Sequence, residues 1–265
     1  MNINIEFKGL KEVIDNLDAL AKKQVPYAAA KALTKTAQDV KEAEVKQLSA
    51  SLDRPTPYTL GSMYVKSATK SDLTAMVYFK DKWSAGKGNP AANWMHPQVI
   101  GGQRNTKRFE VALQRIGVLP KGLYIAPGSA CPLDAYGNIP SGLIIQILSY
   151  FRAFGEQGYR ANITDKRKAA LAKGSKRKGT LGYEYFVSYG KGTWSGRQHL
   201  PAGIYKRIGF AQGSAIKPIM MFVSSPAYHK RFPFFDLAQK VINQRLMPNF
   251  NEAMREALLT ARRTG

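Results

Sequence analysis

In the first eighty residues, a strand-like alternation of apolar and polar side chains is followed by apolar residues at helical spacing. Residues 2–7 alternate polar and apolar side chains, which predicts a short strand. Apolar residues at helical spacing then predict an amphipathic helix over about 9–23. Pro26 suits the first turn of a second helix that continues to about Ser51, because the N–H that proline lacks has no partner there. The buried side of this second helix is marked by Leu33, Ala37, Val40 and Leu48.

The next part of the sequence predicts a hairpin and then a long loop. Residues 73–79 alternate cleanly and residues 62–68 alternate more weakly, and the Lys-Ser-Asp segment between them can close an antiparallel hairpin. Residues 81–105 are rich in Gly, Pro, Asn and Trp, which is typical of an extended loop. A loop of that length inside a domain is usually functional or mobile.

The second half of the sequence predicts strands enclosed by helices. The strand-like runs are 122–126, 183–189, 203–210 and 216–224. The helical runs are 140–154 and about 235–262, and Pro248 can kink the second of these. Residues 155–182 hold many Lys and Arg but few large apolar residues, which favours an exposed loop or arm.

This order of elements predicts an α+β fold. We expect a mainly antiparallel sheet that is packed by N-terminal and C-terminal amphipathic helices and that carries long basic loops. We expect residues 1–265 to form a single structural domain with inserted loops at about 81–121 and 155–182.

Charge is the most unusual property of the composition. The formal net charge is +22, and it is unevenly spread. Residues 1–81 hold 12 Lys/Arg against 10 Asp/Glu, whereas residues 82–265 hold 28 against 8. A positive field of this size favours a polyanionic partner, either nucleic acid or an acidic protein surface.

The densest basic segment has two interpretations. It can be a solvated linker, or it can contact DNA phosphate or an acidic neighbour without reading base sequence. The candidate contact residues are Lys166, Arg167, Lys168, Lys173, Lys176, Arg177 and Lys178. Aromatic residues follow at Tyr183, Tyr185, Phe186, Tyr189 and Trp194. Such residues can stack on single-stranded bases, but alternating aromatics more often face the core of a sheet.

The sequence shows no reactive centre. Cys131 is the only cysteine, and His96, His199 and His229 are far apart, so neither a disulfide framework nor a zinc ligand set is expected. Cys131 could act as a nucleophile only beside a histidine, and a small apolar filler is its commoner role. The glycine-rich stretches 86–88 and 190–193 lack P-loop spacing. We expect no metal, no cofactor and no enzymatic activity.

The sequence also predicts a soluble protein made in the cytoplasm. The start has no cationic patch followed by an apolar run, so a signal peptide is not expected. No stretch approaches the roughly 18 continuous apolar residues of a membrane helix.

Four stretches resemble the tail-completion, minor tail protein Z-like proteins of tailed phages and prophages. The first is Phe7-Lys8-Gly9-Leu10 with Val25-Pro26-Tyr27-Ala28-Ala29-Ala30-Lys31-Ala32-Leu33. The second is Leu133-Asp134-Ala135-Tyr136-Gly137-Asn138-Ile139-Pro140, which forms a tight turn that enters an apolar helix. The third is Leu200-Pro201-Ala202-Gly203-Ile204-Tyr205-Lys206-Arg207. The fourth is Lys217-Pro218-Ile219-Met220-Met221-Phe222-Val223, followed by Tyr228-His229-Lys230-Arg231-Phe232.

The resemblance implies a structural virion protein without catalysis. Proteins of this class act at the neck or the head-proximal end of the tail, as a ring that joins tail to head. It implies a homo-oligomer whose partners are other tail, connector or portal proteins, with the genomic DNA backbone as a further partner. The location is then the virion, after assembly in the bacterial cytoplasm. Two alternatives stay open, a non-specific nucleic-acid-binding protein and a phage-encoded hydrolase or nuclease.

Overall fold

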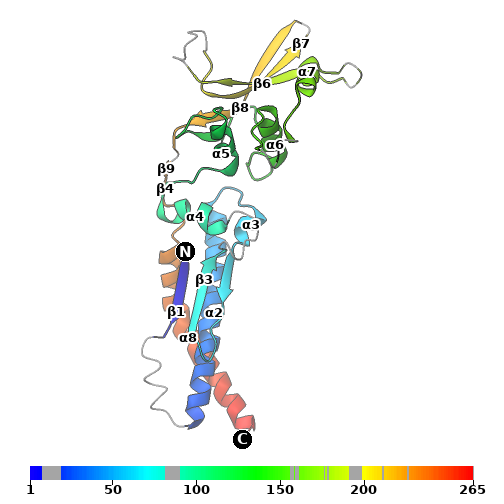
Figure 1. Ribbon diagram of the computed structural model, residues 1–265. Coiled ribbons are helices and arrows are strands. Elements are labelled where there is room, and N and C mark those ends of the chain that lie inside the picture. The colour runs from blue at the N-terminus through cyan, green and yellow to red at the C-terminus, as the bar shows by residue number, and fades with distance from the viewer. Residues whose placement is uncertain are drawn as a thin grey trace. The chain divides into compact units, whose positions relative to one another are not determined.

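The computed structural model describes residues 1–7, 19–80, 90–155, 158, 161–175, 177, 179–190, 199–210, 212–225 and 227–264. The chain divides into two compact units (Figure 1). Unit 1 contains residues 1–102 and 228–265, and unit 2 contains residues 103–227. Helices at both ends of the chain and antiparallel sheets confirm the predicted α+β class. That the whole chain behaves as a single domain stays a prediction.

Unit 1 is built on two long helices that run side by side (Figure 1). These are α2 (Ala19–Ser51) and α8 (Phe234–Thr264). A three-stranded antiparallel sheet of order β1-β3-β2 packs against α2. Its strands are β1 (Asn2–Glu6), β2 (Met63–Lys66) and β3 (Thr74–Phe79). Two shorter helices, α3 (Pro57–Leu60) and α4 (Ala91–Ile100), complete this unit.

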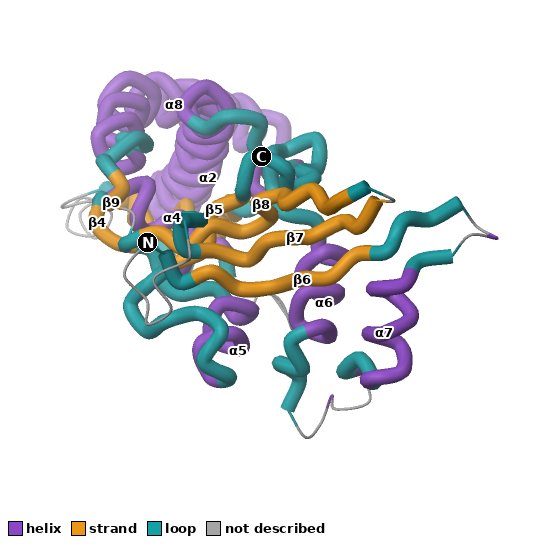
Figure 2. Tube along the Cα trace, turned by 90° about the horizontal axis from the view of Figure 1, so that it is seen from above, coloured by secondary structure: helices purple, strands orange, loops and turns teal. Residues whose placement is uncertain are grey.

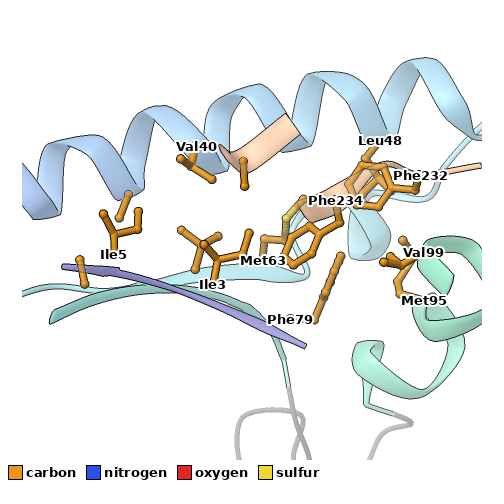
Figure 3. Packing of buried hydrophobic residues seen from close by; sticks show 14 of the residues in the cluster. Ile3, Ile5, Val40, Leu48, Met63, Phe79, Met95, Val99, Phe232 and Phe234 are labelled. Carbon is orange, nitrogen blue, oxygen red and sulfur yellow. The ribbon is translucent and has the colours of Figure 1, made fainter. Parts of the chain in front are cut away.

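The core of unit 1 lies between the sheet and the helices (Figure 3). Alternate residues of β1 and β3, such as Ile3, Ile5 and Val77, are buried, as the period of two requires. Phe79 packs against Phe232 and Phe234, with ring centroids 6.4 and 5.2 Å away. Residues from both ends of the chain therefore share one core.

The seam between α2 and α8 combines small apolar residues with polar pairs. Ala28 and Ala32 of α2 cluster with Ala253 and Ala257 of α8, so the two backbones can approach closely. Along the same seam Asn249 donates to Thr36 Oγ1 at 3.0 Å and to Asp39 Oδ2 at 2.9 Å. Further ion pairs cross the seam: Arg245 with Asp39 at 3.1 Å, Lys35 with Glu252 at 2.6 Å, and Lys31 with Glu256. These pairs fix the antiparallel register of the helices.

Glu44 is a buried acid on α2. Its side chain is fully enclosed, and neither carboxyl oxygen has a hydrogen-bond partner among the described residues. Burial raises the pKa of the Glu44 carboxyl to about 8. The group is therefore mostly protonated in the folded protein at neutral pH.

Unit 2 is a four-stranded antiparallel sheet with helices packed against it (Figure 2). The strand order is β5-β8-β7-β6. The strands are β5 (Tyr124–Pro127), β6 (Tyr183–Ser188), β7 (Gly203–Phe210) and β8 (Gly213–Val223). The helices are α5 (Arg108–Arg115), α6 (Ser141–Tyr150) and α7 (Asp165–Lys173). A separate two-stranded pair joins β4 (Gly102–Gln103) to β9 (Ala227–Tyr228).

Several predicted boundaries were wrong. Pro26 lies inside α2, which begins seven residues earlier at Ala19, so the expected helix start is an interior position. The missing N–H costs one hydrogen bond, but a helix of 33 residues packed along α8 tolerates it. Of the helix expected over about 9–23, residues 9–18 lie outside the described residues. The expected loop 81–105 contains α4, with Pro97 inside it, and its first part, 81–89, is not described.

The expected basic arm 155–182 contains α7. Thr164 caps this helix by accepting the N–H of Arg167 at 3.3 Å, and Asp165 follows in the first turn, where a negative charge is favourable. Gly174 ends the helix with φ of 72°, a conformation that glycine adopts without strain. Lys166, Arg167, Lys168 and Lys173 therefore belong to a capped helix.

Candidate polyanion interface

The positive charge is concentrated in unit 2. Residues 103–227 hold 19 Lys/Arg against 5 Asp/Glu, a net charge of +14. Residues 1–102 and 228–265 hold 21 against 13, a net charge of +8. Unit 2 therefore carries most of the excess on fewer residues.

The acids of unit 2 that the structure describes are all engaged inside the unit. Glu184 pairs with Arg207 at 2.6 Å, and Asp165 pairs with Arg152. Asp134 Oδ1 accepts the backbone N–H groups of Tyr136 and Asn138. Glu110 is fully buried, and Glu156 lies outside the described residues. Apart from Arg104, Arg152 and Arg207, no lysine or arginine of unit 2 forms an ion pair among the described residues.

The buried Glu110 carboxylate accepts hydrogen bonds that connect separate segments of unit 2. It accepts two hydrogen bonds from the Arg104 guanidinium, at 2.5 and 2.8 Å, and the N–H groups of Lys107 and Ile125. Burial alone would raise the pKa of Glu110, but the hydrogen bonds from Arg104 and from the two backbone N–H groups outweigh it and lower that pKa. Glu110 thus stays ionised and joins α5 to β5.

The structure divides the seven predicted contact residues. Lys166, Arg167 and Lys173 are exposed on α7, and Arg177 is exposed beyond it. Lys168 is half-buried, with its Nζ 4.5 Å from the centroid of the Tyr150 ring. The other two, Lys176 and Lys178, lie outside the described residues. Whether these residues contact a partner stays a prediction.

Two lysines of the sheet, Lys206 and Lys217, lie on β7 and β8, and the edge strand β6 beside β7 contacts α7. Tyr150, Tyr185 and Tyr183 form a chain of edge-to-face contacts, with ring centroids 5.1 and 5.6 Å apart. Lys206 Nζ lies 4.0 Å from the centroid of Tyr183, a residue that lines a shallow pocket together with Arg167. Lys217 is the direct partner of Lys206 across β7 and β8. Figure 2 shows α7 beside β6 at this end of the sheet.

We name this region the α7–β7 surface and define it by Arg167, Lys168, Lys206 and Lys217 around Tyr150 and Tyr183. Burial, and then the nearby charge of Lys217, lower the pKa of Lys206. Ammonium and guanidinium groups at these positions can hold phosphate or carboxylate oxygens. The sequence pattern did not identify Lys206 or Lys217 as candidate contact residues. In β7, Lys206 shares one face of the strand with two apolar residues, Ile204 and Ile208.

The aromatic residues after the basic segment serve mainly to pack the sheet. Tyr185 is buried in the core of unit 2, and Phe186 stacks on Tyr205 with ring centroids 5.7 Å apart. Gln146 Nε2 donates to the hydroxyl of Tyr183 at 2.7 Å. These contacts confirm the interpretation of a sheet core for Tyr185 and for Tyr183 beside it, whereas Tyr189 is exposed. Trp194 lies outside the described residues.

Cys131 fills space in the core of unit 2. Its side chain is buried within that cluster, and burial raises the pKa of the Cys131 thiol. A protonated thiol is a poor nucleophile, so the filler interpretation is confirmed. In the described part of the chain, no three His, Cys, Asp or Glu side chains gather into a set that could hold a metal ion. A membrane crossing would need a long apolar helix, and the described residues form none.

The turn at Asp134 is closed by hydrogen bonds from the backbone to its carboxylate. Asp134 Oδ1 accepts N–H groups from Tyr136 at 2.9 Å and from Asn138 at 2.8 Å, and Gly137 has φ of 78°. Helix α6 follows from Ser141. The expected tight turn into an apolar helix is therefore confirmed.

Comparison with known proteins gives one match. Residues 7–119 match the family model described as prophage minor tail protein Z (GPZ). No curated protein and no solved structure matches the chain. The match confirms the predicted resemblance over this part of the sequence. It contains the first of the four stretches, whereas the stretches at 133–140, 200–207 and 217–232 lie beyond it.

Proposed function

Because the chain is minor tail protein Z-like over residues 7–119, we propose that it is a structural protein of a tailed phage or prophage particle. The family match carries this proposal and supports a phage tail structural protein. In finer detail, the chain acts without catalysis at the neck or the head-proximal end of the tail. It forms a ring with other copies, contacts tail, connector or portal proteins, and is assembled in the host cytoplasm before it enters the virion.

An exposed apolar stripe on α8 supports the assembly role. Met247 and Leu258 are each about half exposed, and Met254 lies between them at helical spacing and is partly buried. These exposed side chains form a surface that can pack against a neighbour. It lies in unit 1, which also contains most of the matched residues.

Purified particles test the proposed function. Mass spectrometry of the virions should detect the protein, negative-stain images should show density at the head-proximal end of the tail that is lost when the gene is deleted, and sizing should show an oligomer at one assembly stage. A protein that is absent from mature particles, or that stays monomeric at every stage, would contradict the proposal.

A second candidate function is a free protein that binds nucleic acid without sequence specificity. The net charge of +14 on unit 2 favours it. The two candidates differ in location, because a free binding protein remains in the lysate after particles are removed. Quantifying the protein in the particle and lysate fractions therefore separates them.

A further inference from the structure

We infer that the α7–β7 surface binds the phosphate backbone of DNA, with Lys206 and Lys217 acting as a pair. The inference rests on the proposed function for its setting, a particle component that meets the genome. The binding itself is a property of unit 2. The inference adds Lys206 and Lys217 to the candidate contact residues of the basic segment. It also names DNA as the partner in place of an acidic protein surface.

The first observation behind the inference is the position of Lys206 and Lys217 in the sheet. Lys206 and Lys217 are direct partners in the antiparallel register, and like charges directly opposite each other destabilise a sheet. Lys206 is also half-buried, and its Nζ lies over the Tyr183 ring. Neither lysine forms an ion pair among the described residues. An anion held between the two ammonium groups would offset their repulsion.

The surrounding residues extend the positive surface to α7. Arg167 lines the same pocket as Tyr183, and Lys168 lies over Tyr150, which contacts the same tyrosine cluster. The nearest described acid on α7, Asp165, is paired with Arg152. A partner with evenly spaced negative charges can therefore contact Arg167, Lys168, Lys206 and Lys217 together.

The chemistry of the surface favours nucleic acid over an acidic protein. The cores of protein–protein interfaces are depleted of lysine and enriched in accessible aromatic residues. Here three of the four cations are lysines, while Tyr185 is buried and the Tyr183 hydroxyl accepts a hydrogen bond from Gln146. Interfaces with DNA are polar and strongly positive, as this surface is.

The same contacts predict binding that ignores base sequence. The tyrosine rings pack against one another and against lysine side chains, so they are not free to stack on bases. Four cations that each neutralise one phosphate should give a slope of about −4 for log K against log salt concentration.

A salt titration with purified full-length protein tests the inference. The probe is a fluorescent duplex of about 30 base pairs, and anisotropy is measured between about 50 and 200 mM KCl. The variant Lys206→Ala/Lys217→Ala should bind at least about tenfold more weakly at low salt, with a slope shallower by about 2. A control with the same loss of charge, Lys46→Ala/Lys240→Ala, removes exposed lysines of unit 1. It should bind within about threefold of the unmodified protein with its slope unchanged.

Two further variants separate binding from folding. Lys217→Ala alone changes an exposed residue and should lower the slope by about 1. Lys206→Arg/Lys217→Arg keeps both charges and should retain binding. The inference is overturned if the Ala double variant and the unit 1 control lose affinity equally, or if the slope does not change. It is also overturned if poly-glutamate competes as well as DNA of equal charge, because an acidic protein is then the better partner.

Failure of this experiment can be told apart from failure of the proposed function. DNA binding is measured on the isolated protein, whereas the proposed function is tested by the presence of the protein in particles. A protein that is found at the tail but does not bind DNA would overturn only the inference.

Discussion

In unit 1 acidic and basic residues meet across the seam between α2 and α8, whereas in unit 2 the few described acids are engaged within the unit and basic residues remain in excess. The pairs Lys35–Glu252 and Asp39–Arg245 set the register of two helices. Lys206 and Lys217 are partners in the register of β7 and β8, and neither forms an ion pair among the described residues. Ion pairs therefore link the two long helices of unit 1, whereas unit 2 keeps a net charge of +14 that is available to a partner.

The largest effect is expected from the buried acid of unit 2. Glu110→Ala removes the acceptor for Arg104 and for two backbone N–H groups, and it leaves a guanidinium that is only 13% exposed without its counter-charge. We expect the free energy of unfolding to fall by about 3–5 kcal/mol, measured by urea denaturation.

Glu184→Ala is the matched control, because the Glu184–Arg207 pair is largely exposed. It should cost less than about 1 kcal/mol. Equal losses in the two variants would mean that the Arg104–Glu110 pair is not the structural centre of unit 2.

Glu44, the buried acid of unit 1, should destabilise the folded protein at neutral pH, whereas Glu110 stabilises it. The folded pKa of Glu44 is raised to about 8, whereas an unfolded glutamate titrates near 4.3, so the native state holds its proton more tightly. Between about pH 4.5 and pH 8 only the unfolded chain releases this proton, and stability therefore falls as pH rises. The contribution of Glu44 to this loss is about 1.4 kcal/mol per pH unit inside the window, or roughly 3 kcal/mol from pH 5 to pH 7.5.

Glu44→Gln should remove that dependence. Denaturant titrations at several pH values should show a smaller slope for this variant and higher stability than the unmodified protein near pH 8. Glu42→Gln, at an exposed position on the same helix, should follow the unmodified protein. A Glu44→Gln profile that runs parallel to the unmodified one would show that Glu44 does not titrate in this range.

A smaller effect is expected at the alanine seam. Ala32→Leu inserts three carbon atoms where α2 packs closely on α8, and it should lower the unfolding free energy by about 1–3 kcal/mol. Ala50→Leu, at an exposed position near the end of α2, should change it by less than about 0.5 kcal/mol. Thermal unfolding of the two variants should separate them clearly, and equal melting temperatures would argue against a close seam.

Local patterns in the sequence predicted the strands of unit 2 well, because their period of two is regular. The expected strand 203–210 has the bounds of β7, and the expected strand 183–189 exceeds β6 by one residue. The helices were harder to predict. Pro26 was read as a helix start because proline is favoured there, but packing along α8 keeps it inside α2. Helix α7 was not predicted because its many basic residues favoured an exposed loop or arm, although Thr164 and Asp165 provide a helix start signal.

The residues that distinguish the two units depend on contacts between distant segments. Glu44 falls between Val40 and Leu48 on the buried side of α2, and only tertiary packing shows that this position is enclosed. The pairing of Lys206 with Lys217 depends on the register of β7 and β8, which includes an irregularity between Ile204 and Tyr205. No local pattern predicts that α7 lies beside β6, the edge strand of this sheet.

A cryo-electron microscopy map of particles from the phage or prophage that encodes the chain tests the central claim most directly. We expect the map to show a ring of copies at the head-proximal end of the tail, with Arg167, Lys168, Lys206 and Lys217 within contact distance of DNA phosphates. A particle that lacks the protein, or a ring whose α7–β7 surface faces away from the DNA, would contradict the claim.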